Sequence, residues 1–97
     1  MERRVVITGL GVVSPVGTGV EKFWNSLLEG KSGIALITRF DAADFPVKIA
    51  GEVKDFDPAL AGDKKTIRHM DRNAQFAVAA ARMAVEDAKL DMEKENP

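Results

Sequence analysis

An alanine-rich stretch near the end of the chain most constrains how this sequence can fold. Between Ala74 and Val85, ten of twelve residues are apolar, and only Gln75 and Arg82 are polar. Nothing in the range Thr66–Lys89 breaks a helix, so the sequence predicts one long helix there. A helix that is apolar on nearly all sides is normally interior to a larger protein, whereas a chain of 97 residues buries only about two-thirds of its unfolded surface. We therefore expect these residues to belong to a larger protein or to fold with a partner; an alanine-rich surface helix is the alternative.

The N-terminal third predicts a strand, a loop and a helix. Val5–Thr8 is a continuous β-branched run, which is typical of a central strand covered on both faces. A loop follows over Leu10–Gly17. Apolar residues then recur with a helical period from Val20 to Leu28, and Gly30 is suited to end the helix. Thr18 and Glu21 have the spacing of a capping box at its start.

The middle of the chain has a weaker pattern. Ile34, Leu36 and Phe40 are interpreted as part of an irregular connection, with a turn opened by Asp41. The alternation over Val47–Val53 predicts a half-exposed strand.

Composition excludes several kinds of chemistry. The net charge is -1, so the chain has no overall positive electrostatic potential that would attract nucleic acid or an anionic membrane. The absence of cysteine excludes disulfides and a thiol nucleophile within these residues. The single histidine, His69, has no second histidine with which to form a metal pair and is interpreted as a surface residue. No cofactor and no metal site are expected.

No apolar run is long enough to span a membrane and the N-terminus is a poor signal peptide, so we expect a soluble, cytoplasmic chain.

Two local features invite a binding hypothesis. Gly9-Leu10-Gly11 after a strand partly matches a dinucleotide fingerprint, but Ser14-Pro15 stands where that motif continues into a helix. Close approach of the backbone to a neighbouring element is the favoured interpretation of these glycines.

A local excess of positive charge lies over residues 62–72, where Lys65, Arg68 and Arg72 would share one side of a continuous helix. Such a cluster either attracts an acidic partner or only solubilises the helix.

Seven blocks stand in order along the chain: Arg4–Gly17, Phe23–Leu28, Gly30–Ile34, Arg39–Asp41, Val53–Phe56, Met70–Arg72 and Glu86–Ala88. Taken together, these blocks resemble the start of the β-ketoacyl-acyl carrier protein synthases, the condensing enzymes of fatty-acid elongation, and of their type II members in particular. The resemblance implies an α/β fold: the N-terminal part of a thiolase-like layered fold with a central strand, an amphipathic helix and a long, buried, alanine-rich helix. Residues 1–97 would form the N-terminal segment of the first thiolase-like half, with no complete second domain.

Family members carry out decarboxylative Claisen condensation with an active-site cysteine and two histidines. None of these residues is present, since the chain has no cysteine and His69 lies outside the histidine motifs. The chain alone is expected to be inactive, and no catalytic residue is assigned. Whether it works as an enzyme stays open.

The resemblance also implies partners. Lys65 and Arg68 match basic positions that dock acyl carrier protein in the family, and Lys64 is a neighbouring candidate. His69 stands where relatives often carry another cation, and Lys89 where glycine is common. A homodimer is expected at full length, with no nucleic-acid or membrane partner. Three hypotheses remain: the N-terminal portion of a condensing enzyme, a truncated non-catalytic module that binds carrier protein or a synthase subunit, and a small nucleotide-binding domain.

Overall fold

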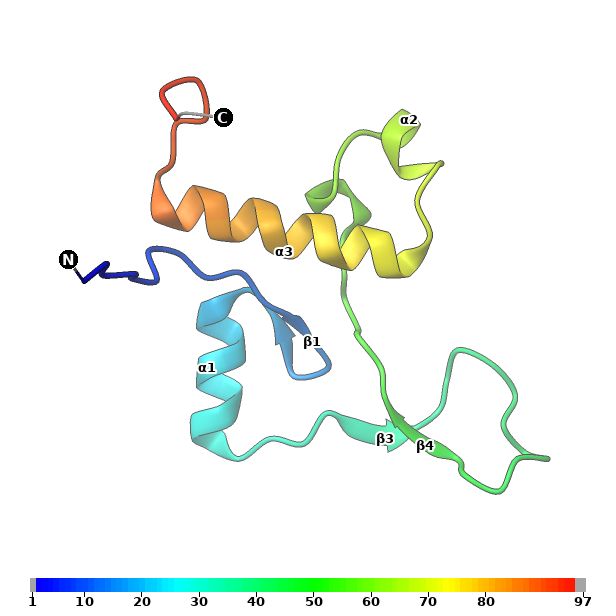
Figure 1. The fold of residues 1–97 in the computed structure, drawn as a ribbon. Helices are drawn as coiled ribbons and strands as arrows, with labels where there is room; N and C mark the ends of the chain where they lie inside the picture. The colour runs from blue at the N-terminus through cyan, green and yellow to red at the C-terminus, as the bar shows by residue number, and fades with distance from the viewer. Residues whose placement is uncertain (1, 96–97) are drawn as a thin grey trace. The chain divides into compact units, whose positions relative to one another are not determined.

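A computed structural model describes residues 2–95 of the chain, which divides into two compact units (Figure 1). One unit comprises Val12–Phe56, and the other joins the residues up to Gly11 with those from Asp57 onward. The predicted segment 1–97 also includes residues 1, 96 and 97, which lie outside the described residues.

In the Val12–Phe56 unit, a short hairpin is followed by an amphipathic helix. Strand β1 (Val13–Ser14) pairs antiparallel with β2 (Gly17–Thr18), and α1 spans Val20–Glu29. The buried Ser26 of α1 donates a hydrogen bond from Oγ to the Val16 carbonyl oxygen at 2.7 Å, which ties the helix to the hairpin.

The two ends of α1 differ in how well the sequence predicts them. Gly30 ends the helix in the left-handed conformation with φ 71°, as predicted. The predicted capping box at Thr18 and Glu21 is wrong. Gly19 takes the N-cap position with φ 96°, a backbone conformation that favours glycine, and no side chain caps the helix.

A second antiparallel pair follows in the same unit. Strand β3 (Ile34–Leu36) pairs with β4 (Ile49–Gly51), with Ile34 opposite Gly51. The predicted strand at 47–53 is thus confirmed over its central residues, whereas the irregular connection expected at Ile34–Leu36 is wrong there. The predicted turn at Asp41 is confirmed, since Asp41 Oδ1 accepts a hydrogen bond from Ala43 N at 3.0 Å.

The other unit contains three helical elements: a 3₁₀ helix η1 (Pro58–Leu60), α2 (Lys64–Ile67) and α3 (Arg72–Ala88). The predicted single helix over Thr66–Lys89 is therefore wrong. Asp71 interrupts it with extended backbone (φ -75°, ψ 173°), and its Oδ1 accepts a hydrogen bond from Ala74 N at 2.8 Å. A carboxylate that satisfies a free amide in this way starts a new helix.

The N-terminal residues run beside α3 (Figure 1) without forming a strand. Leu10 N donates a hydrogen bond to Asp87 Oδ2 at 3.0 Å, and Gly9 and Gly11 lie against the helix backbone. The predicted central strand at Val5–Thr8 is wrong for the described residues, because no strand is assigned before Val13. A central strand needs neighbours on both sides, and Val5 is 91% exposed.

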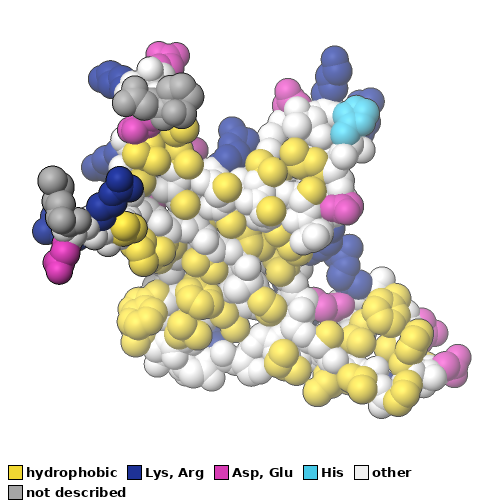
Figure 2. Space-filling model, viewed as in Figure 1, with side chains coloured by type: hydrophobic (Ala, Val, Ile, Leu, Met, Phe, Trp, Pro, Cys, Tyr) yellow, Lys and Arg dark blue, Asp and Glu magenta, His cyan; other side chains and the backbone are white. Residues whose placement is uncertain are grey.

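Little apolar surface is buried within residues 2–95. The buried hydrophobic residues are Ala42, Ala61 and Ala79, and no large side chain in this range is fully buried. Figure 2 shows hydrophobic side chains spread over the visible face. Only Ala79 of α3 is fully buried, so the helix is less buried than predicted. So few buried side chains in each unit are what we expect of a piece that completes its packing within a larger protein.

Candidate functional site: a basic surface at α2

The predicted docking residues lie on and just after the short helix α2. Asp63 caps the helix, because its Oδ1 accepts a hydrogen bond from Thr66 N at 2.8 Å. Lys64 and Lys65 occupy the first turn, and Arg68 is the C-cap residue. All three cationic residues are exposed. Figure 2 shows Lys and Arg side chains at this corner as well as elsewhere on the visible face.

The capping contact also favours the ionised form of Asp63. The backbone N–H of Thr66 is the main cause that lowers the pKa of Asp63 below its ordinary value of 3.8. The carboxylate adds a negative charge beside the three cations.

The structure brings only two of the three predicted residues to a common surface hollow. Lys64 and Arg68 are four residues apart, and the Arg68 N–H donates to the Lys64 carbonyl oxygen at 3.2 Å. Both residues line an open hollow of about 610 Å³. Lys65 lies outside the hollow lining. The complete lining is Asp57, Pro58, Ala59, Gly62, Asp63, Lys64, Ile67 and Arg68.

Arg72 does not extend this basic surface in the way that the predicted helix implied. Helix α2 ends at Ile67, so Lys65, Arg68 and Arg72 are not on one continuous helix. The Arg72 guanidinium lies over the Phe76 ring, 4.7 Å from its centroid. This cation–π contact holds Arg72 along α3.

Two local signals in the sequence point to this hollow. Asp57-Pro58 starts a 3₁₀ turn, in which Asp57 Oδ1 accepts a hydrogen bond from Ala59 N at 3.0 Å. Asp63 stands three residues before Thr66, the spacing of an N-cap contact. Two capped turns close together in the sequence indicate a rigid corner, but they do not reveal which side chains line it.

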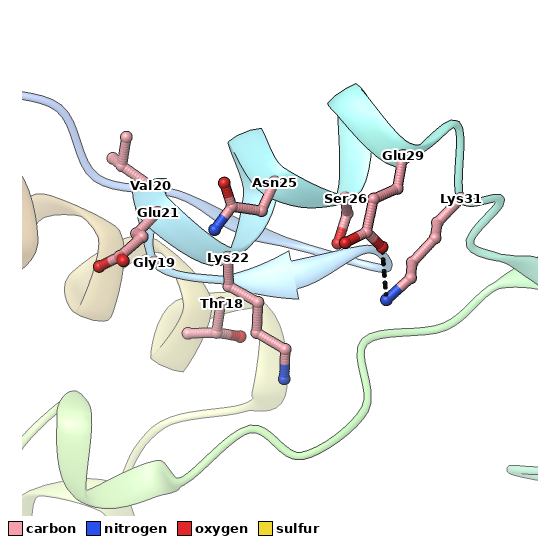
Figure 3. Close-up of a pocket in the computed structure, with 9 residues that line it drawn as sticks. All are labelled: Thr18, Gly19, Val20, Glu21, Lys22, Asn25, Ser26, Glu29 and Lys31. Atoms are coloured by element: carbon pink, nitrogen blue, oxygen red, sulfur yellow. Dashed lines mark ion pairs between the residues drawn. The ribbon is translucent and has the colours of Figure 1, made fainter.

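A second pocket lies around the start and one side of α1 (Figure 3). Its ion pair joins Lys31 Nζ to Glu29 Oε2 at 3.0 Å, and both side chains are well exposed. The Thr18 hydroxyl is buried without a hydrogen-bond partner among residues 2–95. Ser26 Oγ is engaged with the Val16 carbonyl and is not poised as a nucleophile.

The glycines of the dinucleotide hypothesis are occupied in packing. A β-carbon on Gly9 would lie 2.7 Å from Ala88 N, and one on Gly11 would lie 2.9 Å from Ala84 N. The following residues enter the β1–β2 hairpin and not a helix. A pyrophosphate site needs open glycine amides at a helix start, so this geometry contradicts the nucleotide hypothesis and confirms the close-approach interpretation.

No group of three or more His, Asp or Glu side chains within residues 2–95 could hold a metal ion. No helix in that same range is long and apolar enough to cross a membrane.

Comparison with known proteins gives the family. The profile described as "Beta-ketoacyl synthase, N-terminal domain" matches residues 2–97. The chain belongs to the β-ketoacyl synthase family, of which it represents an N-terminal portion. It is 58% identical over 95 residues to "3-oxoacyl-[acyl-carrier-protein] synthase 2" of Coxiella burnetii, covering 98% of this chain and 23% of that protein. The protein of the same name from Synechocystis sp. is 48% identical over 89 residues, covering 92% of this chain and 21% of the relative.

A solved structure agrees with these relatives. "The ishigamide ketosynthase/chain length factor" superposes with a TM-score of 0.85 at 48% identity, covering 96% of this chain and 23% of that chain. This likeness supports an α/β fold of the ketosynthase N-terminal kind. The chain thus spans about a quarter of the length of the relatives that it matches.

Proposed function

We propose that these residues are the N-terminal portion of a 3-oxoacyl-[acyl-carrier-protein] synthase that elongates fatty acids by decarboxylative Claisen condensation. The single observation that carries the proposal is the match along nearly the whole chain to proteins of that name, at 58% identity in one case. The chain contributes packing elements and part of a surface that docks acyl carrier protein.

The reaction needs groups that this stretch does not contain. A cysteine thiolate accepts the acyl chain from one carrier protein, which forms an enzyme thioester and releases the carrier thiol. Malonyl-carrier protein then loses CO₂, and the resulting carbanion attacks the thioester carbonyl, which forms a carbon–carbon bond and releases the cysteine. Donors aimed at the carbonyl oxygen stabilise the negative charge that develops there. With no cysteine in its 97 residues, the chain by itself is inactive.

The first test is made on the protein at the length that its gene encodes. Intact mass is measured before and after incubation with acyl-carrier protein, followed by addition of malonyl-carrier protein. We expect a mass several times 10.5 kDa, an acyl adduct on a cysteine, and a 3-oxoacyl product. A product of 97 residues that forms no adduct would overturn the enzymatic proposal.

The alternative is a truncated, non-catalytic module that binds acyl carrier protein or a synthase subunit. The observation that favours it is the exposed group Lys64, Lys65 and Arg68 in a chain without a thiol. The first test separates the two proposals, since only the module predicts a product of 97 residues that binds carrier protein.

Docking has a test of its own. Because long-range attraction between charges is screened by salt, binding of acyl carrier protein through these residues weakens as the salt concentration rises. The double variant Lys65→Glu/Arg68→Glu should lose binding in a titration at low salt. Lys54→Glu, an exposed lysine of the other unit, is the matched control and should bind as the parent does. Unchanged affinity of the double variant would reject the docking role.

A further inference from the structure

Helix α1 turns a polar side chain toward its own unit and leaves large apolar side chains outside. Ser26 is only 6% exposed, and its hydroxyl donates to the Val16 carbonyl oxygen. Trp24, Leu27 and Leu28 are instead 56%, 47% and 68% exposed. An amphipathic helix of a folded domain normally places its apolar side against the core. The described residues of the unit that contains α1 therefore leave these three side chains largely uncovered.

The exposed side chains form one continuous surface, which we call the α1 stripe and which consists of Val20, Trp24, Leu27 and Leu28. Trp24 stands four residues after Val20 and four before Leu28. Leu27 follows Trp24 by three residues, so the helical period places the whole set on one side of the helix. Tryptophan brings a large apolar area to a contact, and it is frequent at the energetic centre of interfaces. Because folded proteins rarely leave such a contiguous patch in water, the α1 stripe is a contact surface.

The charges beside the α1 stripe select neither an acidic nor a basic occupant. Glu21, Lys22 and Glu29 lie on the rest of the helix, and Lys31 follows its end. Lys31 Nζ pairs with Glu29 Oε2 at 3.0 Å, and the two carboxylates and two ammonium groups of this set balance. An occupant of the stripe is therefore held by apolar contact, which salt does not screen. Such a surface suits an apolar element that stays in contact, and not a strongly charged partner.

Resting on the proposed function, we infer that the α1 stripe is covered by an apolar element of the same polypeptide, one that follows residue 97 in the full-length synthase. The match to the relative from Coxiella burnetii covers 98% of this chain but 23% of that protein, so about three quarters of a protein of that length lies outside the match. An element of the same polypeptide meets the stripe at a high effective concentration, which favours it over a second protein molecule. The occupant is thus neither a second copy of the protein nor the carrier protein.

Photo-cross-linking of the full-length protein, with acyl carrier protein present, identifies what covers the stripe. Photo-leucine, a diazirine analogue with nearly the shape of leucine, is incorporated in place of leucine. Peptide mass spectrometry then locates the links that form from position 28 on irradiation, and an unirradiated sample is the control. We expect a link from position 28 to a residue numbered above 97, in species with the mass of a single chain. A link to a second copy, to the carrier protein, to residues 2–95 alone, or to no protein residue at all would overturn the inference.

Thermal stability gives an independent measure of burial at the stripe. Leu28→Ala in the full-length protein should lower the thermal midpoint by several degrees, because a cavity would remain against the covering element. Leu28→Met keeps nearly the same volume, so this matched control should stay close to the parent. A midpoint for Leu28→Ala equal to that of the parent would place Leu28 in water and overturn the inference.

The two levels of the proposal fail in different ways. If the gene encodes a product of 97 residues, the inference and the proposed enzymatic function are overturned together. If the full-length protein forms the 3-oxoacyl product but position 28 links to another molecule or to none, the inference is overturned and the function stands.

Discussion

Gly11 lies directly against the backbone of Ala80 in α3. A β-carbon at position 11 would overlap the Ala80 carbonyl oxygen and lie 2.9 Å from Ala84 N. Gly9 stands in the same relation further along the helix, where a β-carbon would overlap the Ala84 carbonyl oxygen. The two glycines allow the N-terminal segment to approach a helix whose alanines leave its backbone accessible.

Gly11→Ala should lower the free energy of unfolding by about 1–3 kcal/mol, because the new methyl group forces the segment away from α3. The measurement is urea denaturation of the protein at the length that its gene encodes. Gly30→Ala is an informative control, because it meets nothing within 4 Å but sits at φ 71°. Gly30→Ala should lower the free energy of unfolding by about 1 kcal/mol, because a residue with a β-carbon disfavours the left-handed backbone conformation. Coincident unfolding curves for Gly11→Ala and the parent would contradict the close contact.

Lys89→Gly should stabilise the protein by about 1 kcal/mol. Lys89 ends α3 in the left-handed conformation with φ 56°, which is costly for a residue with a β-carbon. Its N–H donates to the Glu86 carbonyl oxygen at 3.1 Å, and the Leu90 N–H donates to that of Val85 at 3.2 Å, both of which glycine preserves. The thermal midpoint measures the gain. Lys89→Ala removes the same charge but keeps the β-carbon, so its thermal midpoint should not rise in this way. An equal rise of the thermal midpoint in both variants would show that the loss of charge, and not the backbone conformation, causes the effect.

Features that depend on neighbouring residues could be predicted from the sequence. The apolar period from Val20 and the glycine at position 30 together define α1 and its end. The turn at Asp41 follows from the ability of its carboxylate to accept the amide two residues later. The glycines at positions 9 and 11 likewise indicate close approach of the backbone to a neighbouring element, though they do not reveal that this element is α3.

Features that depend on distant residues were predicted less well. The run Val5–Thr8 has the composition of a central strand, but residues 2–95 provide it with no strand partners. The helix prediction over Thr66–Lys89 failed because propensity gave no weight to Asp71 as a cap in the middle of the range. Of the candidate site, the docking role of Lys64, Lys65 and Arg68 stays a prediction, and all three residues are exposed. The hollow depends on how η1 and α2 pack, which the sequence does not reveal.

Glu52 gives the final prediction, a local dependence on pH. Its carboxylate accepts hydrogen bonds from Thr38 Oγ1 at 2.8 Å and from Arg39 N at 3.0 Å. The Thr38 hydroxyl is the main cause that lowers the pKa of Glu52 below its ordinary value of 4.5. The stabilisation from these bonds is therefore fully present above pH 4.5 and is lost as the pH falls through the lower pKa of the folded state.

In an NMR titration, the amide resonances of Thr38 and Arg39 should shift together with the Glu52 carboxyl carbon, with a common midpoint below 4.5. Glu52→Gln keeps an oxygen acceptor but cannot titrate, so the two amides should lose this transition. The difference in unfolding free energy between parent and variant should also shrink as the medium is acidified through that midpoint. A midpoint at 4.5 or above, or a transition that persists in Glu52→Gln, would show that these hydrogen bonds do not favour the ionised carboxylate.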